Sequence, residues 1–207
     1  MLHVPPEFQG VLDNDEHLLW SGRPTATPFF LTGVPFLIIG LIWGVLDFGF
    51  IQGFLKTGVE KGPGLWFIGP FFLLHLAPLW LGVGNMLRLL LVFNNTHYAF
   101  TNKRLMLRGG FWGTDFKAID YDGIQEMEVT VNPIENMLGV GTIRVFTGRT
   151  TSKGVNVYDR FIGIPNPYDV YKQLKQISVD IKTDWNYPNA LRPTTNPGYP
   201  TGYEPRR

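Results

Sequence analysis

The sequence predicts an α+β membrane protein, in which a two-helix transmembrane hairpin is followed by an antiparallel β domain with a C-terminal helix. Two long apolar stretches, residues 28–55 and 65–93, predict the hairpin. After Asn94 the chain changes to short segments of alternating polarity, which predict strands with one buried face. One amphipathic segment beginning at Asn166 predicts the closing helix.

Both apolar stretches are longer than the roughly 20 helical residues that cross a bilayer. The first carries one ionisable residue, Asp47, and the second carries His75 and Arg88. A glycine-rich connection, Gln52–Gly64, joins them. A soluble domain rarely holds two such stretches so close together, so we expect the chain to be embedded in a membrane.

The predicted organisation has four parts. They are a cytoplasmic lead-in (1–27), the transmembrane hairpin (28–93), the strand domain (94–178) and a tail rich in proline and glycine (179–207). Residues 1–27 carry four carboxylates and one arginine, whereas residues 94–207 carry 14 basic and 11 acidic side chains. The start of the chain lacks the basic region of a signal peptide, so cleavage is not expected.

Basic residues near the helix ends predict the orientation. Lys103, Arg104 and Arg108 follow the second span, whereas the connection offers only Lys56 and Lys61. The positive-inside rule therefore places both termini and the strand domain in the cytoplasm, and we expect a multi-pass protein of the cell inner membrane.

Period-two alternation and turn residues delimit six candidate strands. They are His97–Thr101, Arg104–Gly109, Thr114–Tyr121, Ile124–Val131, Thr142–Thr147 and Gly154–Ile162. After the last strand, Asn166 can cap a helix and Pro167 suits its first position. Val170, Leu174, Ile177 and Ile181 then follow at near-helical spacing on one stripe, so this helix is expected to cover the sheet.

Three segments together resemble the bacterial pleckstrin-homology (PH) domain family. They read HYAFTNKRLMLRGGF, AIDYDGIQEMEVTVNPIENMLGVGTIRVFTG and FIGIPNPYDVYKQLKQI, and the resemblance covers residues 16–178. The matching positions are Tyr98, Thr101, Asn102, Arg104, Gly110, Ile124, Val129, Leu138, Gly139, Gly141, Ile143, Gly163, Ile164 and Pro167. The resemblance implies a PH-like antiparallel β sandwich or barrel with a C-terminal capping helix. Asn132-Pro133 departs from the family, and the proline is expected to end a strand and begin a short helix.

Composition and motifs exclude several classes of function. The chain has no cysteine and a formal net charge of +1, which argue against a thiolate metal site and against a nucleic-acid partner. Phosphate-loop, HExxH and GxSxG motifs are absent, and the four histidines lack metal-ligand spacing. We therefore expect neither catalysis nor a metal, and no cofactor of the chain's own.

The turn Thr101–Arg104 is the first candidate site. One interpretation is a plain turn in which Asn102 adopts a left-handed conformation. The alternative is that Lys103, Arg104 and Arg108 contact lipid headgroups, as eukaryotic relatives of the fold do.

Polar residues inside the spans are candidates by default. Asp47 lies near the far end of its span, where interfacial exposure is the favoured expectation. Arg88 is expected to extend toward headgroups. His75, three residues before Pro78, is expected to bond a neighbouring helix, with contact to a haem or pigment as the less favoured alternative.

Gly40, Gly44, Gly49 and Gly53 recur at four-residue spacing, which permits close helix packing in a membrane. They could pack the first helix against the second or against an external partner, and both uses remain open. The expected function is a non-catalytic, membrane-anchored interaction module. It would be an accessory, structural or assembly subunit of a larger complex, photosynthetic or respiratory for example, with membrane lipids and other subunits or further copies as partners. The alternative is a peripheral sensor of anionic lipid headgroups.

Overall fold

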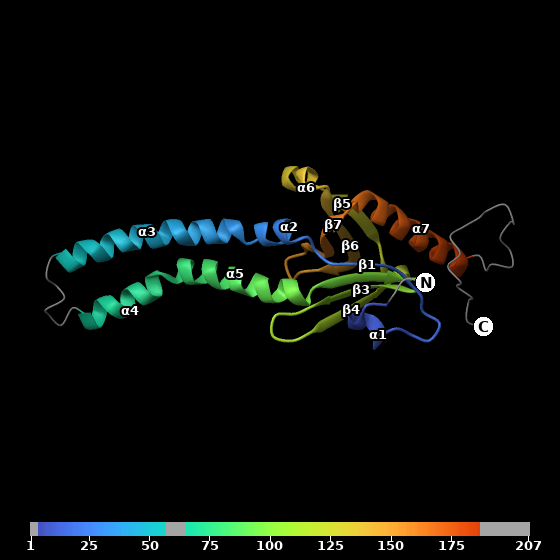
Figure 1. Cartoon of the computed structure of the whole chain (residues 1–207), viewed down its shortest axis with the longest axis horizontal. Helices are drawn as coiled ribbons and strands as arrows, with labels where there is room; N and C mark the ends of the chain where they lie inside the picture. Colours follow the sequence, from blue (N-terminus) through green and yellow to red (C-terminus); the bar gives the residue numbers. More distant parts are fainter. Residues whose placement is uncertain (1–3, 57–64, 187–207) are drawn as a thin grey trace. The chain divides into compact units, whose positions relative to one another are not determined.

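The computed structural model describes residues 4–56 and 65–186. The chain divides into two compact units. One contains residues 1–28 and 95–207, and the other contains residues 29–94. The first unit holds the strands and the second holds the long apolar helices (Figure 1).

The strand unit contains two antiparallel sheets. The first has the order β1 (Leu18–Gly22), β2 (His97–Thr101), β3 (Arg104–Gly109) and β4 (Asp115–Asp120). The second has the order β5 (Glu126–Thr130), β6 (Val140–Thr150) and β7 (Asn156–Pro165). The short elements of this unit are α1 (Pro6–Gln9), the 3₁₀ turn η2 (Tyr121–Gly123) and α6 (Pro133–Met137). The expected α+β class and the strand positions between 97 and 165 are confirmed.

Helix α7 (Pro167–Asn186) closes the strand unit. Its stripe of Val170, Leu174, Ile177 and Ile181 is buried in one core cluster with residues of both sheets. The apolar spacing of the sequence predicted this contact. The helix continues beyond residue 178, so the start of the predicted tail, 179–186, belongs to α7, whereas 187–207 lie outside the described residues.

The N-terminal segment differs from the expected separate lead-in. Strand β1 pairs with β2, with Gly22 opposite Tyr98, so these residues form an edge of the first sheet. The indole of Trp20 stacks on Phe100 with ring centroids 5.4 Å apart. Residues 1–27 are mostly polar, so this five-residue strand was not predicted, although the side chain of its central residue packs on the core.

The expected short helix after Asn132 is present as α6. Asn132 Oδ1 accepts a hydrogen bond from the Glu135 backbone N–H at 2.9 Å, and Glu135 Oε2 accepts one from the Asn132 N–H at 3.0 Å. This reciprocal capping box fixes a helix of only five residues. Thr142 Oγ1 donates to Glu135 Oε1 at 2.8 Å and attaches the helix to β6.

The apolar unit contains α3 (Val34–Lys56), α4 (Leu65–His75), the second half of α2 (Ala26–Leu31) and all of α5 (Ala77–Asn95) but its last residue. By length and composition, α3 and α5 could each cross a membrane, with mean hydropathies of 2.2 and 1.3 over their most apolar windows. The first five residues of the predicted connection continue α3, and residues 57–64 lie outside the described part of the chain.

The second apolar stretch is not one helix, and this expectation is corrected. The helix is interrupted at Leu76, between α4 and α5, because Pro78 has no N–H to donate and disfavours helical geometry at the residue before it. Trp43 Nε1 donates to the His75 carbonyl at 2.9 Å, and Trp80 Nε1 donates to the Leu73 carbonyl at 3.2 Å. Indole N–H groups thus bond two carbonyls at the break.

Candidate functional site

The turn between β2 and β3 holds the first group of predicted site residues. Glu16, whose side chain is fully buried, accepts hydrogen bonds from Arg104 Nε at 3.0 Å and Arg104 Nη2 at 2.8 Å. Thr101 Oγ1 donates to the same carboxylate at 2.7 Å. Arg104 Nη2 also donates to the Val11 carbonyl at 2.8 Å. Arg104 therefore joins the N-terminal segment to the sheet.

These contacts decide the charge state of the pair. Burial alone would raise the pKa of Glu16, but the hydrogen bonds from Arg104 and Thr101 outweigh it and hold the pKa below its usual value. The same carboxylate raises the pKa of Arg104. Both groups are thus charged at neutral pH, and the pair is an internal ion pair rather than a free cation.

Lys103 is also engaged within the chain. Its ammonium group forms ion pairs with Asp15 and, at 3.5 Å, with Asp13. The expected left-handed Asn102 is wrong, since Asn166 is the non-glycine residue of the described chain with a positive φ. Asn102 instead accepts a hydrogen bond from the His17 N–H at 2.8 Å through Oδ1. The polar groups of this turn thus form ion pairs and hydrogen bonds with the carboxylates and the backbone of the N-terminal segment.

Arg108 lies at the other end of the same strands. It is opposite His97 in the register, whereas Arg104 adjoins the turn that follows Thr101. Arg108 lies four positions along the strand from Arg104, about 13 Å at 3.3 Å per residue. Among the described residues Arg108 has no ion-pair partner. The structure therefore places Arg108 away from Lys103 and Arg104, the two cations with which the sequence grouped it.

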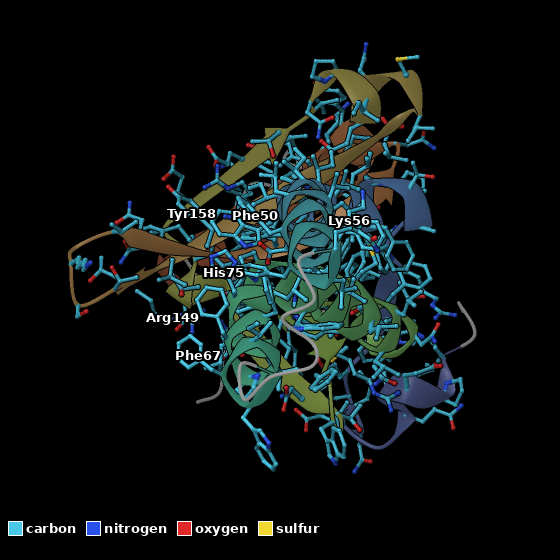
Figure 2. All side chains as sticks on the ribbon, turned by 90° about the vertical axis from the view of Figure 1, so that its left-hand side faces the viewer. Phe50, Lys56, Phe67, His75, Arg149 and Tyr158 are labelled. Carbon is cyan, nitrogen blue, oxygen red and sulfur yellow. The ribbon has the colours of Figure 1, made fainter. Side chains whose placement is uncertain are left out.

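Within the apolar unit, Asp47 and His75 form a pair. His75 Nδ1 is 2.9 and 3.0 Å from the two carboxylate oxygens of Asp47. The Asp47 side chain is 2% exposed, so the expected interfacial exposure is wrong. Figure 2 labels His75, whose side chain is 40% exposed. Contact with a haem or pigment would have to use Nε2, because Asp47 engages the other ring nitrogen.

The four glycines of α3 divide into two pairs. A Cβ atom at Gly40 would lie 2.6 Å from the Pro78 carbonyl oxygen, and one at Gly44 would lie 3.0 Å from Leu79 Cδ2. Added Cβ atoms at Gly49 and Gly53 would meet nothing within 4 Å. The first pair thus lies against α5, and the second faces open space within the described chain.

Exposed apolar side chains surround α6. Ile134, Met137 and Leu138 are 47%, 86% and 44% exposed. Beside them lies an open pocket of about 300 Å³, lined by Val131, Asn136, Gly139, Val140, Asn166, Pro167, Tyr168 and Asp169. Of the side chains that line it, those of Tyr168 and Asp169 are ionisable. No group of three or more potential metal-ligating side chains occurs within residues 4–56 and 65–186.

A two-sheet strand unit closed by a C-terminal helix is the arrangement that the sequence resemblance implied. The chain matches the bacterial PH domain family over residues 29–177. It belongs to this family. A search of curated proteins found no match.

Among solved structures, this bacterial PH domain protein is similar to a DUF1696 family protein with a pleckstrin-homology domain from Shewanella loihica PV-4. The two sequences are 17% identical, the TM-score is 0.30, and the match covers 40% of this chain and 71% of the other.

One acidic residue of the sites, Glu16, was not predicted from the sequence. Glu16 lies 88 positions from Arg104, and its neighbours Asp13 and Asp15 made it look like one more solvated charge. Asp47 and His75 are both candidates in the sequence, but their pairing was not predicted. A carboxylate and a histidine in adjacent apolar stretches are a signal for such a pair, since each is costly in hydrocarbon without a partner.

Proposed function

We propose that this chain is a non-catalytic, membrane-anchored interaction module, an accessory or assembly subunit of a larger membrane complex. The exposure of the apolar helices carries the proposal. In the most apolar windows of α3 and α5, 11% of the residues are buried. Phe50 and Phe67, labelled in Figure 2, are 64% and 74% exposed.

Such surfaces are incompatible with water. The core helix of a soluble protein is mostly buried. An exposed apolar patch larger than a few hundred Å² on a soluble protein marks an interaction site. Lipid would cover these side chains at no cost, and every backbone group within a helix is already bonded. The proposed location is the cell inner membrane, with the strand unit in the cytoplasm as the distribution of basic residues favours.

Two features support a role in binding other subunits. Gly49 and Gly53 leave a smooth stretch of α3 at which another helix could approach closely. The exposed α6 surface, on which Met137 is 86% exposed, offers a second, cytoplasmic contact. Neither feature contains a nucleophile or a paired acid and base, so the proposed role is non-catalytic.

Purification of the full chain from its native membrane in mild detergent tests the proposal. The protein is expected in the membrane fraction after an alkaline wash, and to co-migrate with at least one other membrane protein in size-exclusion chromatography. A Met137→Asp variant should lose that companion if α6 contacts it, whereas Lys175→Asp on the exposed face of α7 serves as the matched control. Release by the wash would exclude the anchor, and migration alone would exclude the subunit role.

Contact with anionic lipid is a second candidate, and one observation favours it. Arg108 lies near the end of β3 that adjoins the junction with α5, and it is not held by a carboxylate among the described residues. Arg108→Gln should weaken the preference of the reconstituted protein for anionic lipid, measured as lipid retained on purification. Arg104→Glu is unsuitable for this test because it would place two carboxylates together at Glu16.

A further inference from the structure

The β3–β4 hairpin ends in an exposed aromatic tip. Between Arg108 and Asp115 the chain reads GGFWGT and carries no charge. Phe111 is 43% exposed and Trp112 is 91% exposed, the highest value among the large hydrophobic residues of the described chain. Their rings lie 5.9 Å apart in an edge-to-face arrangement. We refer to residues 110–113 as the aromatic tip.

The backbone of the tip is a defined turn. Gly110 has a φ of +128°, which L side chains rarely adopt. A Cβ atom there would lie 2.4 Å from the Gly113 carbonyl oxygen. The chain therefore closes tightly between Gly110 and Gly113, and the two aromatic side chains project from the turn rather than fold back onto a core.

The position of the tip is set by Asn95, the last residue of α5. Asn95 Nδ2 donates to the Gly110 carbonyl at 3.1 Å. Both residues belong to the strand unit, so this contact lies within one compact body. The tip is thus held beside the point at which the chain leaves its last apolar helix.

We propose that Phe111 and Trp112 insert into the headgroup region of the bilayer that α3 and α5 cross, and so fix the strand unit against the membrane surface. This inference rests on the proposed membrane anchor. If α5 spans the bilayer, Asn95 marks its cytoplasmic boundary, and the tip lies at that depth. Tryptophan and other amphipathic aromatic side chains favour this interfacial layer.

The size of the tip favours lipid over a protein partner. Two aromatic side chains bury about 150–250 Å² each. A stable protein interface buries about 800 Å² on each partner, and the area of the tip alone is much smaller than this. Insertion of one or two aromatic rings into a lipid surface needs no such area, since the transmembrane helices already provide the anchor.

The experiment uses the natural absence of cysteine. Single cysteines are introduced in the full chain as Trp112→Cys, Asp122→Cys and Val45→Cys, labelled with a nitroxide, and reconstituted in lipid nanodiscs. Collisions with oxygen, which concentrates in lipid, are compared with collisions with a water-soluble nickel chelate. Asp122 is the matched control because it is exposed and follows β4 at the end of the sheet away from the tip. Val45, 72% exposed on α3, reports on the anchor itself.

The label at 112 is expected to be shielded from nickel and accessible to oxygen, with the label at 122 accessible to nickel. A Phe111→Ser substitution should shift the label at 112 toward water. If 112 matches 122 while 45 is in lipid, the aromatic tip does not insert and only this inference fails. Shielding of 112 from both reagents would indicate a protein contact and would likewise overturn it. A label at 45 in water would refute the membrane anchor and the inference together.

Discussion

Arg104 Nη2 lies 2.8 Å from Glu16 Oε2, across 88 positions of sequence. This ion pair closes the N-terminal segment onto the β2–β3 turn, with the carboxylate fully buried and the guanidinium side chain 23% exposed. A phosphate would have to displace a buried carboxylate to reach Arg104. The pair thus has a structural role, and of the three cations in the predicted site Arg108 is the one without a carboxylate partner in the described part of the chain.

Removal of one partner of this pair should strongly destabilise the strand unit. Arg104→Met leaves Glu16 buried without its counter-ion, a change that costs about 3 kcal/mol. For a unit of this size that corresponds to a fall of about 10 °C in the unfolding midpoint. Circular dichroism of the full chain in mild detergent measures it.

Lys103→Ala is the matched control for that measurement. Its partners Asp13 and Asp15 are 57% and 78% exposed, and exposed ion pairs contribute less than about 1 kcal/mol. A midpoint shift as large as that of Arg104→Met would contradict the structural difference between the two pairs. Equal, small shifts for both variants would show that Glu16 is not buried with Arg104.

Acid should weaken the fold through Glu16. Its pKa in the folded chain is below the ordinary value of 4.5, so the unfolded chain binds the proton more readily. The stabilisation is therefore complete above pH 4.5 and is lost as the pH falls through the lower folded-state pKa. Unfolding midpoints measured between pH 7 and pH 3 should fall less steeply for Glu16→Gln than for the natural chain. Parallel curves would exclude the carboxylate as the titrating group.

Asp47 and His75 should be energetically coupled. Asp47→Leu leaves the His75 ring N–H without its acceptor, and His75→Phe leaves the carboxylate buried without a donor. Interhelical hydrogen bonds in membrane proteins contribute about 0.6–1.7 kcal/mol in double-mutant cycles. Thermal unfolding of the single and double variants in detergent should give a coupling energy of that order, with the double variant less destabilised than the sum of the two changes. Additive effects would refute the pair.

The fold of the strand unit was accessible from the sequence because alternation, turn residues and the stripe of α7 are local signals. The strand β1 was not, since it pairs with residues about 80 positions away and its flanking charges conceal it. The same holds for the site: the carboxylates that engage Lys103 and Arg104 lie 90 and 88 positions away, so their ion pairs were not predicted. The length of the apolar run predicted one continuous segment, whereas Pro78, which is a local signal for a break, divides it into α4 and α5.

The glycines of α3 provide a test that separates internal packing from partner binding. A side chain at Gly40 would lie against the Pro78 carbonyl of α5, so Gly40→Leu should push the helices apart and lower the unfolding midpoint. Gly49→Leu meets nothing within 4 Å and should leave the midpoint unchanged. If Gly49 faces a partner helix, however, the larger side chain blocks close approach, and the companion protein should be lost on native purification. Retention of the companion in Gly49→Leu would exclude this face as the docking surface, and a lowered midpoint would show that Gly49 is packed within the chain.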